Sequence, residues 1–322
     1  MIIEKITALM AEDMAAVDAL IRRRLHSGVP LIGELSEYLI SGGGKRLRPL
    51  LLLLTTRAFN YSGHHHFSLA AVVEFIHTAT LLHDDVVDGS DLRRGRKTAN
   101  HLWGNEASVL VGDFLYSRSF QMMVETGNVR VMEILADATN TIAEGEVMQL
   151  VHCHDPDTTE ARYLEVIRCK TAKLFEASAQ LGAVLSGCNP KEEQAMAKYG
   201  VHLGAAFQLI DDVLDYSSSS EEMGKNVGDD LEEGKPTLPL IYTLAHGTPE
   251  QAAIVRGSIL TGGRDHLPMV LKAIEASGAI GYTIEVAEAE SKKALNSLPS
   301  LPDNPYCDAL KGLAEFAVRR RR

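Results

Sequence analysis

Apolar and polar positions recur with a helical period along nearly the whole chain. Alanine, leucine, glutamate and methionine are frequent, and no residue-by-residue alternation is bounded by Asn-Gly or Asp-Gly hairpin turns. The pattern therefore predicts an all-α fold of roughly a dozen helices, several of them longer than the usual 11–12 residues. The breaks between helices fall at 41–44, 61–66, 89–95, 154–157, 187–190, 217–228, 247–249, 262–265 and 299–305.

The size and composition of the chain favour a single domain. No shift in composition marks a boundary, and 322 residues with 45% hydrophobic content suit one large core, so we expect one domain over residues 1–322. The leucine run from Leu50 to Leu54 is much shorter than the ~20 apolar residues that cross a bilayer. The four cysteines form no CxxC pair, which favours a reducing, cytoplasmic location.

The charge of the chain narrows the choice of partners. A formal net charge of −11 argues against a nucleic-acid binder, which would carry a basic surface. Arg319 to Arg322 form a basic run that we expect to be a frayed, solvated tail, with contact to anionic lipid as the alternative. His64 to His66 follow a Ser-Gly turn and are expected to lie in an exposed loop.

Two similar pentapeptides stand out, Asp-Asp-Val-Val-Asp at 84–88 and Asp-Asp-Val-Leu-Asp at 211–215. Helical spacings of three and four residues place their carboxylates on one face, and Gln208 lies one turn before the second. Clustered carboxylates repel one another unless cations lie between them, and hard oxygen ligands favour Mg²⁺ over Zn²⁺. The alternative is a pair of solvated helix ends. The predicted metal ligands are Asp84, Asp88, Asp211, Asp212 and Asp215.

Basic residues gather in four short segments of this acidic chain. They are SGGGKRLRP at 41–49, DLRRGRK at 91–97, CKTAK at 169–173 and GKNVGDDLEEGKPTLP at 224–239. Guanidinium forks and glycine-rich backbone both suit phosphate oxygens. The first segment is not a Walker A loop, because Arg46 stands where serine or threonine is required. Together with two metal sites, these segments predict two bound anions, one held through metal and one held directly.

In this order the motifs resemble those of the trans-isoprenyl diphosphate synthases, and the long-chain bacterial branch, the octaprenyl diphosphate synthases, is the most similar. The resemblance implies the isoprenoid synthase helical bundle, with both aspartate motifs lining a deep central cavity, and a homodimer. It implies that isopentenyl diphosphate units are added to an allylic prenyl diphosphate, farnesyl diphosphate. The product would be a long all-trans polyprenyl diphosphate of octaprenyl length, for quinone side chains. Transient membrane contact would release it.

The resemblance also implies a role for each motif residue. Magnesium held by the aspartates would bind the allylic diphosphate and neutralise the charge that appears as it leaves. The implied catalytic residues are Asp84, Asp85, Asp88, Lys170, Thr171, Gln208, Asp211 and Asp212, of which Thr171 and Gln208 would stabilise the carbocation with oxygen dipoles. The implied allylic diphosphate contacts are Arg93, Lys170, Lys225 and Lys235. The implied isopentenyl diphosphate contacts are Lys45, Arg48, His77 and Arg94.

The side chains just before the first motif predict the length of the product. In the family, a bulky aromatic one turn upstream blocks the growing tail, whereas Ala79 and Thr80 are small, with Ile76 a turn further down. A rise of ~1.5 Å per residue places Ala79 about 7.5 Å below Asp84. We therefore expect a long product, with Met122, Met123 or Leu135 at the cavity floor. The alternative is that the small residues are ordinary packing neighbours.

Two competing functions share parts of this pattern. A terpene cyclase or a head-to-head condensing enzyme would use the same metal chemistry without a second, metal-free diphosphate site. The SGGGKRLRP segment and Arg94 therefore favour chain elongation. A regulatory subunit that keeps the fold without activity is disfavoured, because nothing would otherwise oppose the repulsion within intact aspartate motifs.

Overall fold

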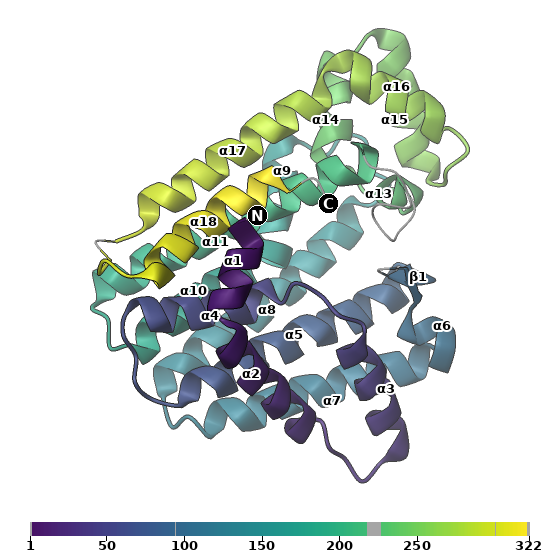
Figure 1. The fold of residues 1–322 in the computed structure, drawn as a ribbon. Coiled ribbons are helices and arrows are strands. Elements are labelled where there is room, and N and C mark those ends of the chain that lie inside the picture. The colour runs from purple at the N-terminus through teal and green to yellow at the C-terminus, as the bar shows by residue number, and fades with distance from the viewer. Residues whose placement is uncertain (1, 94, 218–226, 300, 321–322) are drawn as a thin grey trace. The chain divides into compact units, whose positions relative to one another are not determined.

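The structure is a computed structural model that describes residues 2–93, 95–217, 227–299 and 301–320. The chain divides into two compact units, and each is described by itself. Unit 1 comprises Met1–Thr139, Leu174–Gly200 and Ser297–Leu313, and unit 2 comprises Asn140–Lys173, Val201–Asn296 and Ala314–Arg322. Helices dominate both units, as the ribbon in Figure 1 shows.

The elements that begin in unit 1 include a short hairpin between helices. They are α1 (Ile2–Leu9), α2 (Ala11–Arg24), α3 (Pro30–Ser41), α4 (Leu47–Ala58), α5 (His65–Val87), β1 (Leu92–Arg93), β2 (Arg96–Lys97), α6 (Ala99–Trp103), α7 (Asn105–Val124), α8 (Val129–His152), α11 (Pro190–Ser217) and α18 (Pro305–Arg319). The elements that begin in unit 2 include a five-residue π-helix. They are α9 (Glu160–Ile167), the π-helix η1 (Arg168–Ala172), α10 (Lys173–Leu185), α13 (Asp229–Glu232), α14 (Leu238–His246), α15 (Pro249–Thr261), α16 (Leu267–Ser277) and α17 (Ala279–Ser297).

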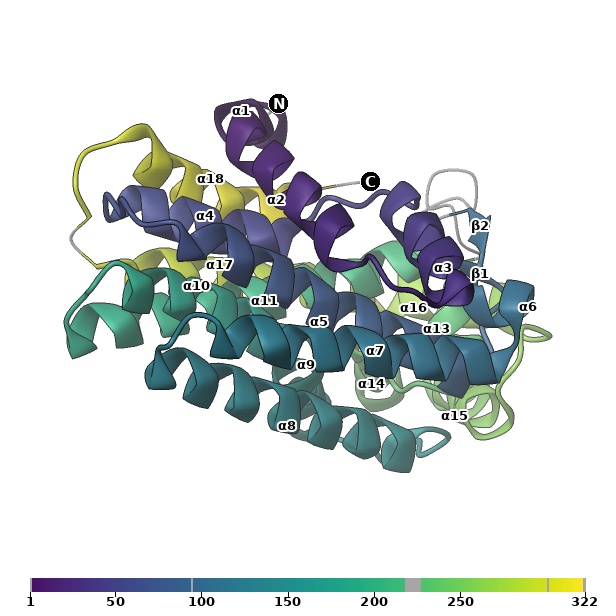
Figure 2. The ribbon, with the colours of Figure 1, turned by 90° about the horizontal axis from the view of Figure 1, so that it is seen from below.

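Helix α5 is the centre of unit 1. It packs against α2, α4 and α7, and Figure 2 shows it running beside α7. Leu50 to Leu54 of α4 are all at most 3% exposed, as expected for a helix that is apolar on every side. Each buried leucine contributes roughly 1.5–3 kcal/mol relative to an exposed one. The first aspartate motif therefore lies on a helix that is packed against three others.

Helix α5 stops at its aspartates for a local reason. Gly89 adopts a positive φ of 62°, and the Ser90 N–H donates to the Asp85 carbonyl at 3.0 Å. This is the Schellman termination that a glycine permits, because it has no Cβ to clash in the left-handed region. The turn ends the helix with Asp88 as its C-cap, so the motif occupies the last helical turn.

Unit 2 has its core where α9, α11, α14 and α17 meet. Tyr163, Leu209, Leu238 and Ala287 are among the buried residues of this cluster. A second cluster joins α14, α15 and α16, and α15 begins with a capping box between Thr248 and Gln251. The second aspartate motif thus lies on a helix that is packed from several directions.

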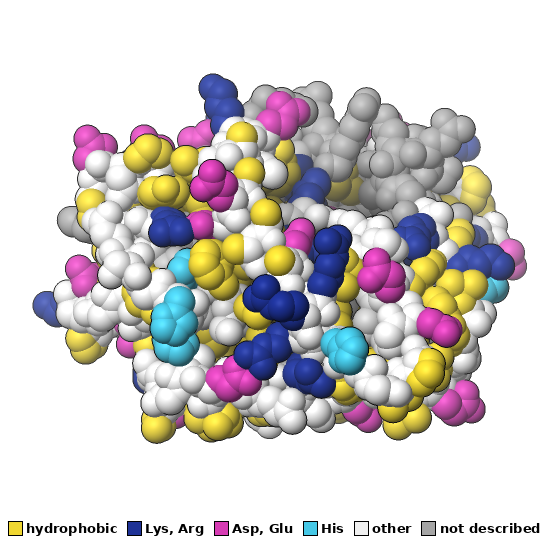
Figure 3. Space-filling view, turned by 60° about the horizontal axis from the view of Figure 1, so that its bottom comes forward, with side chains coloured by type: hydrophobic (Ala, Val, Ile, Leu, Met, Phe, Trp, Pro, Cys, Tyr) yellow, Lys and Arg dark blue, Asp and Glu magenta, His cyan; other side chains and the backbone are white. Residues whose placement is uncertain are grey.

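Large hydrophobic side chains remain exposed on α7. Leu110, Phe120 and Val124 are 66%, 48% and 60% exposed. Hydrophobic side chains reach the surface among charged ones in the space-filling view of Figure 3. Within the described residues, no helix is both long enough and apolar enough to span a membrane.

Three sequence expectations are corrected by the structure. An antiparallel β1–β2 hairpin, which pairs Leu92 with Lys97, begins within the break at 89–95, although no strand was expected. His66 is only 3% exposed and lies in α5, not in an exposed loop. Arg320 is 9% exposed, so it does not belong to a solvated tail. Residues 321 and 322 lie outside the described residues.

Candidate active site

The first aspartate motif combines two part-buried carboxylates with one buried carboxylate. Asp84 and Asp88 keep partial exposure, whereas Asp85 is 4% exposed. The Nε and Nη2 atoms of Arg93 donate to Oδ1 of Asp85 at 2.8 Å and 2.7 Å. Burial raises the pKa of the Asp85 carboxyl, and Arg93 opposes part of that shift. Asp85 therefore anchors the hairpin strand that carries Arg93, and Asp84 and Asp88 are the more accessible carboxylates.

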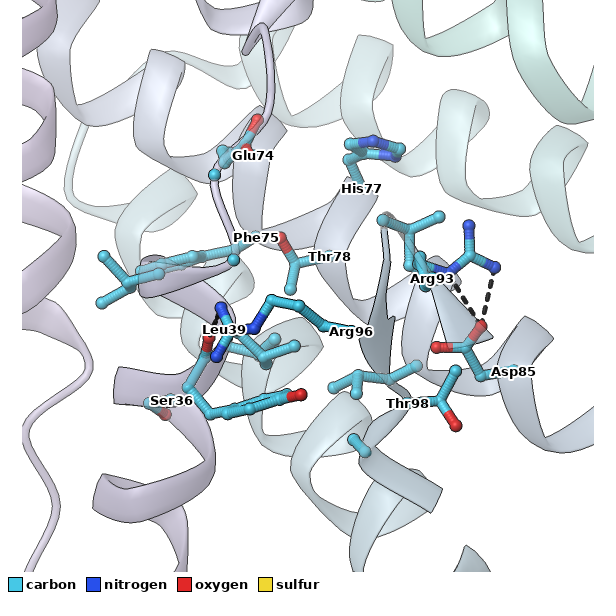
Figure 4. Close-up of a pocket in the computed structure, with 18 of the residues that line it drawn as sticks. Ser36, Leu39, Glu74, Phe75, His77, Thr78, Asp85, Arg93, Arg96 and Thr98 are labelled. Carbon is cyan, nitrogen blue, oxygen red and sulfur yellow. Dashed lines mark hydrogen bonds and ion pairs between the residues drawn. The ribbon is translucent and has the colours of Figure 1, made fainter. Parts of the chain in front are cut away.

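A cavity in unit 1 lies beside this motif. Its lining includes His77, Thr78, Asp85, Arg93 and Arg96, and Figure 4 shows the Arg93 guanidinium directed at the Asp85 carboxylate. The structure thus brings three predicted site residues, His77, Asp85 and Arg93, to one cavity. Arg94 lies outside the described residues, and Lys45 is exposed.

The glycine-rich segment places its basic side chains in different surroundings. Arg48 Nη1 donates to His77 Nε2 at 3.1 Å, and its guanidinium lies 4.5 Å from the centre of the Phe175 ring. The Arg48 fork is therefore held in position before any ligand arrives. Arg46 has a left-handed φ of 44° at the start of α4 and forms an ion pair with Asp18. That pairing gives Arg46 a structural role in the folded chain.

The second aspartate motif is held more tightly than the first. Asp212 is 2% exposed, and it accepts hydrogen bonds from the Tyr163 hydroxyl and, at 2.8 Å, from Gln208 Nε2. Burial raises the pKa of the Asp212 carboxyl, and the charges of Asp230 and Asp211 add to that shift. Burial also raises the pKa of Tyr163, so its hydroxyl stays a donor. Both oxygens of Asp212 are therefore fixed by protein groups.

Asp211 has an unexpected partner at the end of the chain. Arg320 Nη1 lies 2.8 Å from Asp211 Oδ1, and its Nη2 donates to the Phe207 carbonyl. The same guanidinium lies 3.4 Å from the centre of the Phe207 ring. The Asp211 side chain is still 42% exposed, whereas that of Arg320 is 5% exposed. Asp211 thus combines access from solvent with a buried counter-charge.

Lys170 and Thr171 lie in the π-helix η1. Short π-helical turns are uncommon and occur often at functional sites. Lys170 Nζ lies 2.5 Å from Glu146 Oε2 and donates to Gln149 Oε1 at 2.6 Å. Thr171 Oγ1 donates to Gln208 Oε1 at 3.0 Å.

A cavity in unit 2 is lined by most of the residues predicted around the second aspartate motif. Its lining includes Lys170, Thr171, Gln208, Asp212, Lys235, and also Gln149 and Tyr163. Lys235 is 8% exposed and forms an ion pair with Glu233. Lys225 lies outside the described residues. The arrangement of two cations, two oxygen dipoles and a fixed carboxylate around one cavity suits an anionic substrate that develops positive charge.

Comparison with known proteins agrees with this chemistry. The polyprenyl synthetase family matches residues 29–274. The chain is 56% identical over 321 residues to octaprenyl diphosphate synthase of Escherichia coli, with 99% of each chain covered. The chain belongs to the polyprenyl synthetase family. It is therefore a trans-prenyltransferase of the type that makes long all-trans polyprenyl diphosphates.

Solved structures of the polyprenyl synthetase family share its fold. The polyprenyl synthase from Caulobacter crescentus, complexed with calcium and isoprenyl diphosphate, has a TM-score of 0.96 at 46% identity and covers 99% of this chain and 98% of that chain. The decaprenyl diphosphate synthase from Rhodobacter capsulatus has a TM-score of 0.93 at 48% identity, with 99% of each chain covered. The predicted family, the all-helical isoprenoid synthase fold and the prenyltransferase activity are confirmed.

The divalent metal typical of polyprenyl synthetases fits the donors that the motifs offer. Asp84, Asp88 and Asp211 present hard, part-exposed carboxylate oxygens of the kind that Mg²⁺ prefers. Within the described part of the chain, no three His, Cys, Asp or Glu side chains already converge on one metal-sized point. Each motif offers carboxylate oxygens that could form part of a coordination shell, and Mg²⁺ usually completes such a shell with water and substrate phosphate.

The structure adds contacts around the site that the sequence did not predict. Tyr163 and Arg320 contact the second motif, and Glu146 and Gln149 contact Lys170. Tyr163 lies 49 residues before its partner Asp212, so no local spacing could reveal the pair. The basic C-terminal run was a visible signal for Arg320, but a run of charges at a chain end is more often solvated.

Proposed function

We propose that the protein condenses farnesyl diphosphate with several isopentenyl diphosphate units to an all-trans product of octaprenyl length. One observation carries this proposal: each compact unit contains an aspartate motif in contact with an arginine, Arg93 in unit 1 and Arg320 in unit 2, in a chain that is 56% identical over 321 residues to an octaprenyl diphosphate synthase. The aspartate motifs suit a metal-bound diphosphate, and the separate basic groups suit a second anion. Chain elongation needs both anions, since one is the allylic diphosphate and the other is isopentenyl diphosphate.

The reaction begins when the C–O bond between the allylic carbon and the diphosphate breaks. Magnesium bound by Asp84, Asp88, Asp211, Asp212 and Asp215 would supply neutralisation of the charge on the departing diphosphate. Lys170, Arg93, Lys225 and Lys235 hold the same diphosphate oxygens, and Asp85 orients Arg93. Thr171 and Gln208 present oxygen dipoles to the allylic cation that remains. Each residue thus acts on charge that develops in the transition state.

The second substrate is held so that its double bond attacks the cation. Arg48 and His77 form a preorganised pair, and with Lys45 and Arg94 they bind the isopentenyl diphosphate. A new C–C bond forms at the terminal alkene carbon of isopentenyl diphosphate, and the positive charge moves to its tertiary carbon. The methylene between this carbon and the C–O carbon then loses a proton to the departed diphosphate, which forms the new double bond. The product is an allylic diphosphate one isoprene unit longer, which serves as the next primer.

Product length depends on residues of α5 and α7. Ile76 and Ala79 are fully buried, Thr80 is half-buried and Met123 is 2% exposed. We propose that the small side chains at 79 and 80 leave room for the growing tail and that Met123 limits it. The absence of a ring at 79 and 80 supports a long product.

Assembly and location are further parts of the proposal. The exposed apolar side chains of α7 support a homodimer, since helical geometry places Phe120 and Val124 on one side of that helix. The family match at 29–274 includes residues of both units, which supports one functional domain over 1–322. We also propose that the protein is cytoplasmic and that transient membrane contact releases the apolar product.

The test is a product assay on the purified full chain. Farnesyl diphosphate, radiolabelled isopentenyl diphosphate and Mg²⁺ are incubated with the protein, and the dephosphorylated products are separated by reversed-phase chromatography. We expect a product of forty carbons and no product when EDTA removes the metal. A cyclic hydrocarbon, or incorporation of a single unit only, would overturn the proposal. Light scattering of the same sample reports whether the protein is a dimer.

A further inference from the structure

The π-helix η1 sets the position of two site residues at once. It spans Arg168–Ala172 and carries Lys170 and Thr171 side by side between α9 and α10. A π turn inserts an extra residue into a helix and persists only where its surroundings stabilise it. The neighbours of η1 therefore decide where the Lys170 ammonium and the Thr171 hydroxyl lie.

Gly145 of α8 lies directly against this turn. A Cβ atom at Gly145 would be 2.7 Å from the Lys170 backbone nitrogen, 2.9 Å from Cys169 Cβ and 3.0 Å from the Cys169 carbonyl carbon. Real Cβ atoms essentially never come so close to backbone atoms, so any side chain at 145 would push α8 and η1 apart. Glycine is what permits this close approach, although it weakens a helix by roughly 0.5–1 kcal/mol relative to alanine.

The same face of α8 holds the Lys170 side chain. Glu146 and Gln149 are three residues apart, and both reach the Lys170 ammonium, at 2.5 Å and 2.6 Å. Glu146 supplies a counter-charge, whereas Gln149 supplies a neutral acceptor that fixes the direction of the ammonium. Gln149 and Lys170 also line the same cavity as Asp212.

The other end of the turn is linked to the second aspartate motif. Thr171 Oγ1 donates to Gln208 Oε1 at 3.0 Å, and Gln208 Nε2 donates to Asp212 Oδ1 at 2.8 Å. A displacement of η1 by a few tenths of an ångström would therefore move Lys170 and strain the Thr171–Gln208 contact together. Catalytic geometry is sensitive at this scale, since a misplacement of about 1 Å can lower a rate 10²-fold.

We propose that Gly145, Glu146 and Gln149 are positioning residues that fix Lys170 and Thr171 for the allylic diphosphate. Gly145 sets the distance between α8 and η1, and the two polar side chains set the direction of the ammonium. This inference rests on the proposed function of Lys170 and Thr171.

The first test compares Gly145→Ala with Gly257→Ala. Gly257 lies within helix α15 in unit 2, and nothing lies within 4 Å of a Cβ built there, so it is a matched helical control. We expect Gly145→Ala to lower turnover at least tenfold and to weaken binding of farnesyl thiodiphosphate, a non-ionising primer analogue, measured calorimetrically with Mg²⁺. The Michaelis constant for isopentenyl diphosphate should change less than twofold. Gly257→Ala should leave both measurements unchanged.

The second test uses Gln149, which does not depend on the glycine variant folding. Gln149→Leu should weaken binding of the analogue about tenfold, and Gln149→Asn, which keeps a neutral oxygen acceptor, should weaken it less. Circular dichroism of every variant checks the fold. Wild-type binding of the analogue by both Gly145→Ala and Gln149→Leu would overturn the inference. A wild-type protein that elongates no primer would instead overturn the proposed function.

Discussion

The two aspartate motifs are almost identical in sequence, but their surroundings differ. The first lies in the last turn of α5, where Asp84 and Asp88 stay part-exposed and the buried Asp85 is paired with Arg93, eight residues further along the chain. The second lies within the core of unit 2, where Asp212 is 2% exposed and Asp215 is fully buried. Local contacts therefore organise the first motif, and long-range contacts organise the second.

From this difference we expect the two motifs to have different roles. Carboxylates at a helix end can adjust to a metal and its diphosphate as they bind. A buried carboxylate that accepts hydrogen bonds from Tyr163 and Gln208 cannot move far, so its oxygens are held in one orientation before a ligand binds. We expect substitutions around the second motif to act through positioning and those in the first to act through ligand loss.

The largest expected effect is the loss of a metal ligand in either motif. Asp84→Ala and Asp211→Ala should each lower turnover by about 10²–10³-fold or more while the fold is retained, because each removes an accessible carboxylate. A radiolabel incorporation assay and circular dichroism measure the two properties. Asp157→Ala, which removes a carboxylate that is 74% exposed, is the control. Near-normal turnover in either motif variant would contradict the metal assignment.

The helix of the first motif should also control product length. Ala79→Phe is expected to shorten the product to about fifteen or twenty carbons with little change in melting temperature, if residue 79 fronts the space for the tail. Ala70→Phe is the matched control, since Ala70 is also fully buried in α5 and lies on the opposite side by helical period. An aromatic ring forced into packed core typically destabilises by about 1–3 kcal/mol. Chromatography of products and thermal melts separate the outcomes, and an unchanged long product from a stable Ala79→Phe variant would refute the length argument.

A smaller effect on turnover is expected when a hydrogen bond to the second motif is removed. Tyr163→Phe removes one donor to the buried Asp212, and a hydrogen bond to a charged group contributes roughly 1.5–3 kcal/mol. Turnover should fall about tenfold, with the same product length. Tyr282→Phe removes a comparable tyrosine–carboxylate contact, with Glu160, elsewhere in unit 2 and should leave turnover unchanged. Equal turnover in the two variants would mean that Asp212 needs no fixed orientation.

The smallest effect concerns the buried arginine beside Asp211. Arg320→Ala should raise the affinity for Mn²⁺, used as a paramagnetic substitute for Mg²⁺, a few-fold in the absence of substrate, because one positive charge no longer opposes metal binding. Electron paramagnetic resonance counts free Mn²⁺ directly. Arg319→Ala is the control, since that side chain is 71% exposed and lies 3.8 Å from Glu315. A lower affinity in Arg320→Ala would show that Arg320 supports the metal site.

Much of the protein could be predicted from its sequence because the information was local. Helical periodicity, the glycine that ends α5 and the i, i+4 spacing of each motif are properties of neighbouring residues, and the fold, family and activity inferred with them are confirmed. The β1–β2 hairpin was missed because two-residue strands have no periodicity to detect.

Other features depend on residues that are distant in the chain. The sequence by itself determined which side chains could carry the chemistry: the aspartates, the lysines and the arginines of its motifs. Only the tertiary structure decided that Tyr163 holds Asp212, that Arg320 neutralises Asp211 and that Gly145 lies against the Lys170 turn. The physical reason is that burial and counter-charges arise from packing, so two identical aspartate pairs become an accessible site in one helix and a preorganised one in the other.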